Sequence, residues 1–323
     1  MKRPETPYID AALVDNVVSH WRAGELVAIP TETVYGLAAD ACNGQAVANI
    51  YALKARPQFN PLIVHVASME IAQRYVQWSA LATQLAAAFW PGPLTLVLPR
   101  RWEGALSELV SAGGDTLAIR IPAHPLTRQL LAAFDGPIAA PSANRSGHVS
   151  PTTARHVRDE FGDAVPLVVD GGACAVGLES TVLDISGETP VLLRAGSITR
   201  AMLEAVMGAG FEHEAHPTLA PVLKSPGMLS AHYAPSIPVR LNVAAVAADE
   251  ALLAFGPAPL PGAATTLNLS PRGDCIEAAA NLFAMLRALD DSRHRAIAVM
   301  PIPGEGVGEA INDRLQRASR GRS

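Results

Sequence analysis

Cysteine is scarce in this chain of 323 residues, and the cysteines present are not paired. Cys42, Cys174 and Cys275 lie far apart and form no C-x-x-C spacing, which predicts reduced thiols without a catalytic role. The nine histidines include no H-x-x-x-H pair, so neither residue type predicts a zinc site. We therefore expect no metal ion held by the protein alone.

Long apolar runs are also missing. No segment approaches the roughly 20 apolar residues that a membrane-spanning helix needs. The first ten residues, MKRPETPYID, are polar and include two prolines, unlike the apolar region of a signal peptide. We expect a cytoplasmic protein that does not associate with membranes.

Positive charge is in deficit, because the formal net charge is −5. A protein that grips a nucleic-acid backbone usually presents an excess of positive charge, since phosphate contacts supply most of that affinity. Stable nucleic-acid binding is therefore not expected, although a local basic cavity is compatible with overall acidity. Hydrophobic residues make up 49% of the chain, which is typical of a folded protein with a substantial core.

The first two-thirds of the chain alternate helical periodicity with short apolar runs, as α/β proteins do. Helices are expected over 9–21, 47–54, 80–89, 125–134 and 152–161, with another beginning at Ser68. Strands are expected over 26–30, 62–66, 95–99, 116–122, 137–143, 166–172, 180–185 and 191–196. Several strands follow one another without a helix between them, so the sheet should be mixed rather than purely parallel.

Periodicity stops over residues 211–238, a segment with five prolines that predicts a linker or a long ordered loop. Strand and helix patterns then resume as a smaller α/β unit. We therefore divide the chain into a first domain over 1–210, a linker or lid over 211–238 and a second domain over 239–323.

The first candidate element of chemistry is a pair of cations at the end of a helix, Lys54 and Arg56, followed by Asn60. Pro57 and Pro61 make the following path extended and rigid, which suits a cradle for an anion. A structural alternative stays open, because cations also suit the negative end of a helix dipole.

The second candidate is APSANRSG, which directly follows an apolar run and contains Ser142 and Asn144. Such groups at a strand end could bind phosphate or ribose, or could simply form a turn or a helix cap. The chain has no G-x-G-x-x-G and no G-x-x-x-x-G-K-[ST] motif, so an ATP site here would be of an unusual type.

The third candidate set is dispersed over apolar runs. Arg120 and Arg194 each interrupt an otherwise apolar strand, although charged side chains are rarely buried without a partner. Each could reach solvent from an edge strand. Together with Lys54 and Arg56, however, they indicate a cavity for phosphates and carboxylates.

Five motifs, PTETVYGL, KARPQFNPLIVHV, APSANRSG, GLESTV and LLRAG, occur in this order. In order and spacing they resemble the threonylcarbamoyl-AMP synthase family, over roughly residues 8–208. SPGMLSAHYAP and GEGVGEAINDRL resemble the linker and second domain of that family's long form. The resemblance implies a YrdC-type twisted mixed sheet with helices around a central cavity, plus a smaller α/β (Rossmann-like) C-terminal domain.

The resemblance also implies roles for individual residues. The positions that hold L-threonine are matched by Thr33, His65, Arg120, Ala140 and Ser180. The positions that hold ATP are matched by Arg56, Asn60, Thr116, Ser142, Asn144, Ser150, Arg194 and Tyr233. Lys54 and Arg56 are implied as catalytic, with Lys54 facing bicarbonate or the triphosphate.

The implied activity joins L-threonine, bicarbonate and ATP into threonylcarbamoyl-AMP and pyrophosphate, the first step of threonylcarbamoyladenosine modification of tRNA. Mg²⁺ would accompany ATP, and a downstream threonylcarbamoyl transferase would act on tRNA. Many relatives carry two basic linker residues where this chain has Leu229 and Ala231, so linker cations are not expected on phosphates here.

Two other functions remain as alternatives. A similar domain occurs in enzymes that transfer carbamoyl groups during cofactor maturation, but those add acylphosphatase-like and zinc-finger segments that this chain lacks. An RNA-binding protein is disfavoured by the net charge of −5 and by the lack of interleaved basic and aromatic residues.

Overall fold

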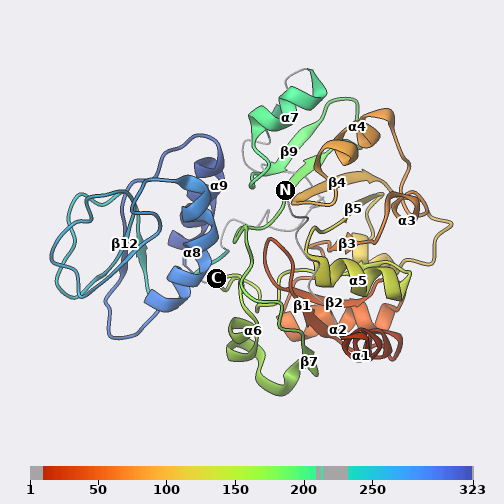
Figure 1. Ribbon diagram of the computed structural model, residues 1–323, viewed down its shortest axis with the longest axis horizontal. Helices are drawn as coiled ribbons and strands as arrows, with labels where there is room; N and C mark the ends of the chain where they lie inside the picture. Colours follow the sequence, from red (N-terminus) through yellow and green to blue (C-terminus); the bar gives the residue numbers. More distant parts are fainter. Residues whose placement is uncertain (1–9, 209–211, 214–231, 322–323) are drawn as a thin grey trace.

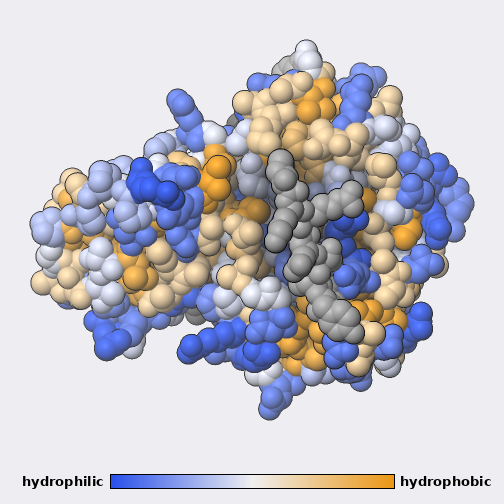
Figure 2. Space-filling view, viewed as in Figure 1, coloured by the Kyte–Doolittle hydropathy of each residue, from blue (hydrophilic) through white to orange (hydrophobic). Residues whose placement is uncertain are grey.

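The computed structural model describes residues 10–208, 212–213 and 232–321 (Figure 1). Most of the predicted linker, including Leu229 and Ala231, therefore lies outside the described residues, as does the boundary placed at residue 210. The described part forms a large first domain and a smaller second domain, and the second projects as a separate lobe (Figure 2). None of the described helices combines the length and apolar character needed to cross a membrane.

The first domain is built on one mixed sheet in the order β10-β9-β8-β4-β5-β3-β6-β2-β1-β7. Its strands are β1 (Val27–Ile29), β2 (Gly36–Asp40), β3 (Ile63–His65), β4 (Leu94–Pro99), β5 (Thr116–Arg120), β6 (Ile138–Ala139), β7 (Leu167–Val168), β8 (Thr181–Asp184), β9 (Val191–Arg194) and β10 (Glu212–His213). β3 pairs with β5 in parallel, whereas β4 and β5 are antiparallel. The prediction of a mixed α/β sheet is confirmed.

Helices surround this sheet and bury its apolar strands. They are α1 (Ala11–Arg22), α2 (Gly44–Lys54), α3 (Met69–Ala72), α4 (Ala80–Phe89), α5 (Pro125–Phe134), α6 (Ala154–Phe161) and α7 (Arg200–Met207), with short 3₁₀ turns η1 (Glu108–Ser111) and η2 (Gly162–Ala164). α1, α2 and α5 gather near one end of the sheet and α4 and α7 near the other (Figure 1). Most begin at a side chain that caps their free N–H groups, such as Asn43 for α2 and Thr153 for α6.

The second domain is a four-stranded parallel sheet in the order β11-β14-β12-β13, with two helices. Its elements are β11 (Val239–Arg240), β12 (Ala251–Ala254), β13 (Thr265–Asn268), α8 (Cys275–Leu289), β14 (Ile297–Val299) and α9 (Val307–Ser319). α8 and α9 lie on the side of this sheet that faces the first domain (Figure 1). This geometry matters for the site, because both helices carry arginines that reach the first domain.

The two domains share one apolar cluster. Leu178 and Val149 of the first domain are buried in it together with Phe283 of α8 and Ile311 of α9. Tyr233, at the end of the linker, joins the same cluster and stacks on Phe283 with ring centroids 5.5 Å apart. The interface is therefore a packed core of its own, as expected where two domains bury apolar surface against each other.

Candidate active site

A pocket lies where several loops and strand ends of the first domain meet the end of the linker. It holds about 540 Å³ of empty space, part of it open to solvent. Its lining residues are Thr31, Thr33, Val34, Gly36, Arg56, Ile63, His65, Arg120, Ala140, Pro141, Ser142, Glu179, Ser180, Arg194, His232 and Tyr233. Residues from all five sequence motifs therefore meet in one cavity.

All five residues matched to L-threonine positions line this pocket. The parallel register of β3 and β5 places His65 directly beside Arg120. The Arg120 guanidinium is held from three sides, because its Nε donates to the Gly92 carbonyl at 3.0 Å, Nη1 to Thr33 Oγ1 at 3.0 Å and Nη2 to Glu32 Oε1 at 2.5 Å. An arginine fixed in this way can receive a carboxylate without losing further side-chain entropy.

Charge is distributed unevenly at this end of the pocket. Burial and the neighbouring Arg120 charge lower the pKa of His65 to about 3, so its imidazole is neutral at pH 7. The hydroxyl groups of Ser180 and Thr95 form a hydrogen bond, with their oxygen atoms 2.7 Å apart. Arg120 is paired with Glu32, and the other polar groups around it, Thr33, His65 and Ser180, are neutral hydrogen-bonding groups that suit a small polar zwitterion.

A second group of lining residues comprises Arg56, Arg194, Ser142 and Tyr233, and it meets the first group where Arg194 contacts Ser180. α2 ends at Ala55 in the left-handed conformation (φ 48°), which turns the chain into the proline-rich loop. Arg56 then donates Nε to the Asn60 carbonyl at 3.0 Å and Nη2 to the Pro61 carbonyl at 2.8 Å. Arg194 at the end of β9 donates Nε to the Ser180 carbonyl at 2.9 Å and Nη2 to Ser180 Oγ at 3.1 Å.

Five residues with predicted roles lie outside the lining: Lys54, Asn60, Thr116, Asn144 and Ser150. Lys54 is 1% exposed, and its ammonium donates to the main-chain carbonyls of Ser142 (2.6 Å) and Asn144. It was expected to face bicarbonate or the triphosphate, but in this structure it supports the turn that carries Ser142. Its catalytic role stays a prediction.

The other four are placed differently. Asn144 is buried, and its amide donates to the carbonyls of Arg145 and His148, both at 2.9 Å, which closes the same turn. Asn60 is buried, and its carbonyl accepts a hydrogen bond from Arg56 Nε. Thr116 lies four residues before Arg120 on the same face of β5. Ser150 donates to Glu179 Oε1 at 2.5 Å.

No individual role was predicted for three residues at the site: Glu32, Glu179 and His232, the last of which lies in the segment expected as a linker or lid. Both carboxylates lie in the motifs PTETVYGL and GLESTV. Acidic side chains were not expected there, because a site for anions favours cationic residues. Each is paired with an arginine, Glu32 with Arg120 at 2.5 Å and Glu179 with Arg314 of α9 at 3.1 Å. His232 lines the pocket, and burial and nearby cations hold its pKa well below the usual value.

The pocket has an excess of positive charge in an acidic protein. Arg56, Arg120 and Arg194 line it, against one lining carboxylate, Glu179. Burial lowers the pKa of Arg56 to about 10, with repulsion from Arg194 as a further cause. Three buried guanidinium groups facing one pocket, of which Arg120 is paired with Glu32, favour a ligand that carries anionic groups. The fold and pocket together define a two-domain α/β protein whose arginine-lined pocket suits small molecules with anionic groups.

Comparison with known proteins identifies the family. A family model described as telomere recombination matches residues 19–196, and one described as the threonylcarbamoyl-AMP synthase C-terminal domain matches residues 198–320. Threonylcarbamoyl-AMP synthases of Pyrococcus abyssi and Bacillus subtilis are 38% and 39% identical, with 92% and 93% of this chain and 91% of each relative covered. The chain belongs to the threonylcarbamoyl-AMP synthase family.

A solved structure agrees over both domains. The crystal structure of P. abyssi Sua5 complexed with L-threonine superposes with a TM-score of 0.90 at 35% identity, covering 97% of this chain and 96% of that one. The expected fold, a YrdC-type sheet followed by a smaller α/β domain, is therefore confirmed.

Proposed function

We propose that this protein is an L-threonylcarbamoyladenylate synthase, which converts L-threonine, bicarbonate and ATP into threonylcarbamoyl-AMP and pyrophosphate. The observation that carries the proposal is the pocket itself. One end presents Arg120 among neutral hydrogen-bonding groups, and the other presents Arg56 and Arg194. These ends suit an amino acid and a nucleoside triphosphate, respectively.

Threonine is bound at the Arg120 end. The guanidinium, already oriented by Thr33, Gly92 and Glu32, receives the amino acid's carboxylate. The neutral imidazole of His65 and the hydroxyl of Ser180 offer hydrogen bonds to the amine and the side chain without adding charge. Support comes from the related P. abyssi protein, which was crystallised with L-threonine.

The chemistry begins when the threonine amine, as the free base, attacks carbon dioxide or the carbon of bicarbonate, and a C–N bond forms. With carbon dioxide the nitrogen then loses one proton to solvent; with bicarbonate a C–O bond breaks, and the departing hydroxide takes that proton and leaves as water. The product in both cases is N-carboxythreonine. The new carboxylate oxygen then attacks the α-phosphorus of ATP. One P–O bond forms, the bond from α-phosphorus to the bridging oxygen breaks, and pyrophosphate leaves with that electron pair. Arg56 and Arg194 stabilise the charge that develops on the phosphates, and no covalent enzyme intermediate is required.

Mg²⁺ is expected to enter with ATP. Glu179, the one carboxylate in the lining, has both oxygens engaged by Ser150 and Arg314. Within the described residues, no group of three or more histidine, cysteine, aspartate or glutamate side chains could hold a metal ion. This donor set fits an ion carried by phosphate oxygens and water, where it neutralises phosphate charge.

Threonylcarbamoyl-AMP is a mixed carboxylic–phosphoric anhydride and is therefore an activated intermediate. We propose that a downstream threonylcarbamoyl transferase passes its acyl group to tRNA, and that this chain itself does not bind tRNA stably, given its net charge of −5. ATP and tRNA are available in the cytoplasm, where we place the enzyme.

The test is pyrophosphate release from ATP with threonine, bicarbonate and Mg²⁺ omitted in turn, in buffers freed of dissolved carbon dioxide. Release is expected only when all are present, because the nucleophile exists only after the amine is carboxylated. Full release without bicarbonate would refute the mechanism. A gel shift with tRNA in the absence of ATP and threonine would instead support the RNA-binding alternative.

A further inference from the structure

The segment Gly177–Leu178–Glu179–Ser180 separates the pocket from the second domain. Gly177 has φ +71°, and a Cβ added there would lie 2.5 Å from Ala280 Cα and 2.6 Å from the Ala279 carbonyl oxygen of α8. Only a residue without a side chain allows this contact between backbones. α8 therefore packs closely against this segment at Gly177. Two later residues of the same segment, Glu179 and Ser180, line the pocket.

Arg314 of α9 reaches the same segment from inside the interface. It is fully buried, and its Nε donates to Glu179 Oε2 at 3.1 Å while Nη1 donates to Asp313 at 2.9 Å. Its guanidinium carbon lies 5.5 Å from the centre of the Tyr233 ring. One arginine of the second domain thus contacts two residues that line the pocket.

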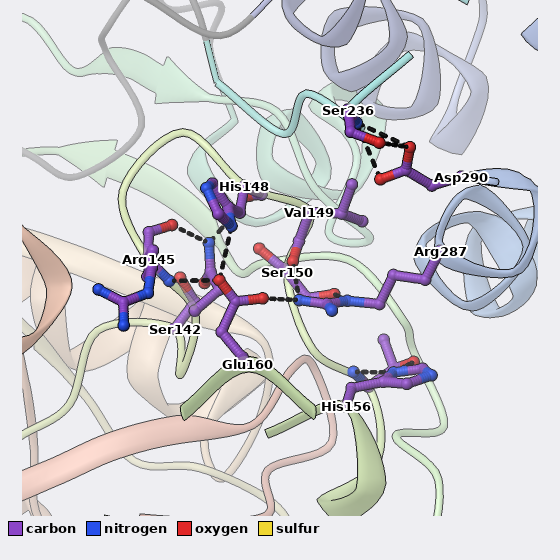
Figure 3. A network of polar contacts seen from close by, with 12 residues as sticks. Ser142, Arg145, His148, Val149, Ser150, His156, Glu160, Ser236, Arg287 and Asp290 are labelled. Carbon is purple, nitrogen blue, oxygen red and sulfur yellow. Dashed lines mark hydrogen bonds and ion pairs between the residues drawn. The ribbon is translucent and has the colours of Figure 1, made fainter. Parts of the chain in front are cut away.

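Ser150 is linked to the second domain in two ways, through Glu179 and directly through Arg287. Its hydroxyl donates to Glu179, the partner of Arg314, at 2.5 Å. Its carbonyl accepts from Arg287 Nε of α8 at 3.4 Å, and the same guanidinium donates to the Val149 carbonyl and to Glu160 (Figure 3). Glu160 in turn accepts from His148 and from the Arg145 amide, so the whole 145–150 loop is tied to α8.

These contacts reach the pocket lining at Glu179. In the parts of the chain that the structure describes, hydrogen bonds and ion pairs from residues 239–321 reach Val149, Ser150, Glu160 and Glu179, and none reaches Thr33, His65 or Arg120. The end that contains Arg120 is fixed by the first domain alone.

We propose that Arg314 is a positioning residue for the nucleotide, through which the second domain sets Glu179, Ser150 and Tyr233 at the triphosphate end without affecting the threonine end. The proposal rests on the function proposed above. The competing explanation is that the Arg314–Glu179 pair only holds the two domains together, in which case both substrates respond equally to its loss.

The test compares Arg314→Gln with the wild type by calorimetric binding of a non-hydrolysable ATP analogue and, separately, of L-threonine. A misplacement of about 1 Å in a site can change its performance about a hundredfold, so we expect the Kd for the analogue to rise about tenfold to a hundredfold. The Kd for threonine should stay within about twofold of the wild type. Arg314→Lys, which keeps a charge beside Glu179, should recover part of the loss. Arg293→Gln is the control, since it removes an exposed ion pair from the same domain and should change neither Kd.

A second pair of variants covers the case in which Arg314→Gln does not fold. Gly177→Ala forces the backbone of α8 away from the pocket segment, whereas Gly208→Ala changes a glycine with the same φ of +71° and no neighbour within 4 Å. Gly177→Ala should weaken binding of the ATP analogue selectively, and Gly208→Ala should not.

The outcomes are separable. Unchanged analogue binding in folded Arg314→Gln or Gly177→Ala, or equal loss of both ligands, would overturn the positioning role. Failure of the wild type to bind the analogue at all would instead refute the proposed function.

Discussion

Replacing Lys54 with methionine tests whether this lysine acts on the reactants or supports the site. Its ammonium is buried and donates to the carbonyls of Ser142 and Asn144. Burial, with repulsion from Arg56, holds its pKa well below the usual value. Methionine has a similar length and apolar stem, so the substitution removes the charge and both hydrogen bonds with little change in volume.

The expected loss follows from two opposing effects. Each hydrogen bond from a charged donor contributes about 1.5–3 kcal/mol, and the two carbonyls are left without this donor. The cost of burying an ammonium is relieved at the same time, which offsets part of the loss. We expect the free energy of unfolding to fall by about 2–4 kcal/mol, which corresponds to a decrease in Tm of roughly 4–16 °C.

Chemical denaturation and steady-state kinetics on the same preparation decide the question. If Lys54 positions the turn that carries Ser142, stability falls and KM for ATP rises together. Arg155→Met, at a side chain that is 87% exposed, is the control and should change stability by less than about 0.5 kcal/mol. A Lys54→Met variant with wild-type stability and a collapsed kcat would refute the positioning argument and favour direct contact with the reactants.

Arg194→Ala should lower turnover by two to three decades, because one contact to developing phosphate charge is worth about 2.7–4 kcal/mol; a parallel melting curve excludes loss of fold as the cause. Serine should replace threonine poorly in pyrophosphate release, but with some activity, since one missing methyl costs about 1–3 kcal/mol. Tyr233→Ala should raise the Kd for ATP and release more AMP than transferable product, measured by chromatography. Burial opposes ionisation of Glu160, but hydrogen bonds from His148 and Arg145 and the charge of Arg287 lower its pKa from 4.5 to about 2. Ionised Glu160 therefore contributes about 3 kcal/mol to the free energy of unfolding. This contribution is present above pH 4.5 and is lost as the pH falls towards 2, so the free energy of unfolding of Glu160→Gln should depend less on pH in acid than that of the wild type.

Elements with strong local patterns were predictable. The helices expected over 80–89 and 125–134 coincide with α4 and α5. β2 was not predicted, because its sequence GLAAD has little intrinsic strand preference, and it becomes a strand by pairing between β6 and β1. The strand expected over 137–143 is reduced to Ile138–Ala139, since the flanking prolines cannot donate to a ladder.

At the site, residue types were more predictable than their partners. Positive charges within apolar strands indicated a cavity shared by Arg120 and Arg194, and both line the pocket. The same argument could not predict that Lys54 would turn towards two main-chain carbonyls rather than into the pocket, because the path of the 142–144 turn is set by tertiary contacts. Glu32 and Glu179 were missed for a related reason, since their roles depend on which arginine each one meets.

Arg314 illustrates a signal that was present in the sequence and could have been used. Ile311, Leu315 and Ala318 follow helical spacing and form the buried face of α9, and Arg314 falls on that same face. A charged side chain in such a position requires a buried partner of opposite charge. The spacing alone could not say that this partner lies 135 residues away in the first domain. The position of Arg314 on the buried face does indicate a cation at the surface that α9 packs against another domain. In this structure that surface contacts Glu179, which lines the pocket.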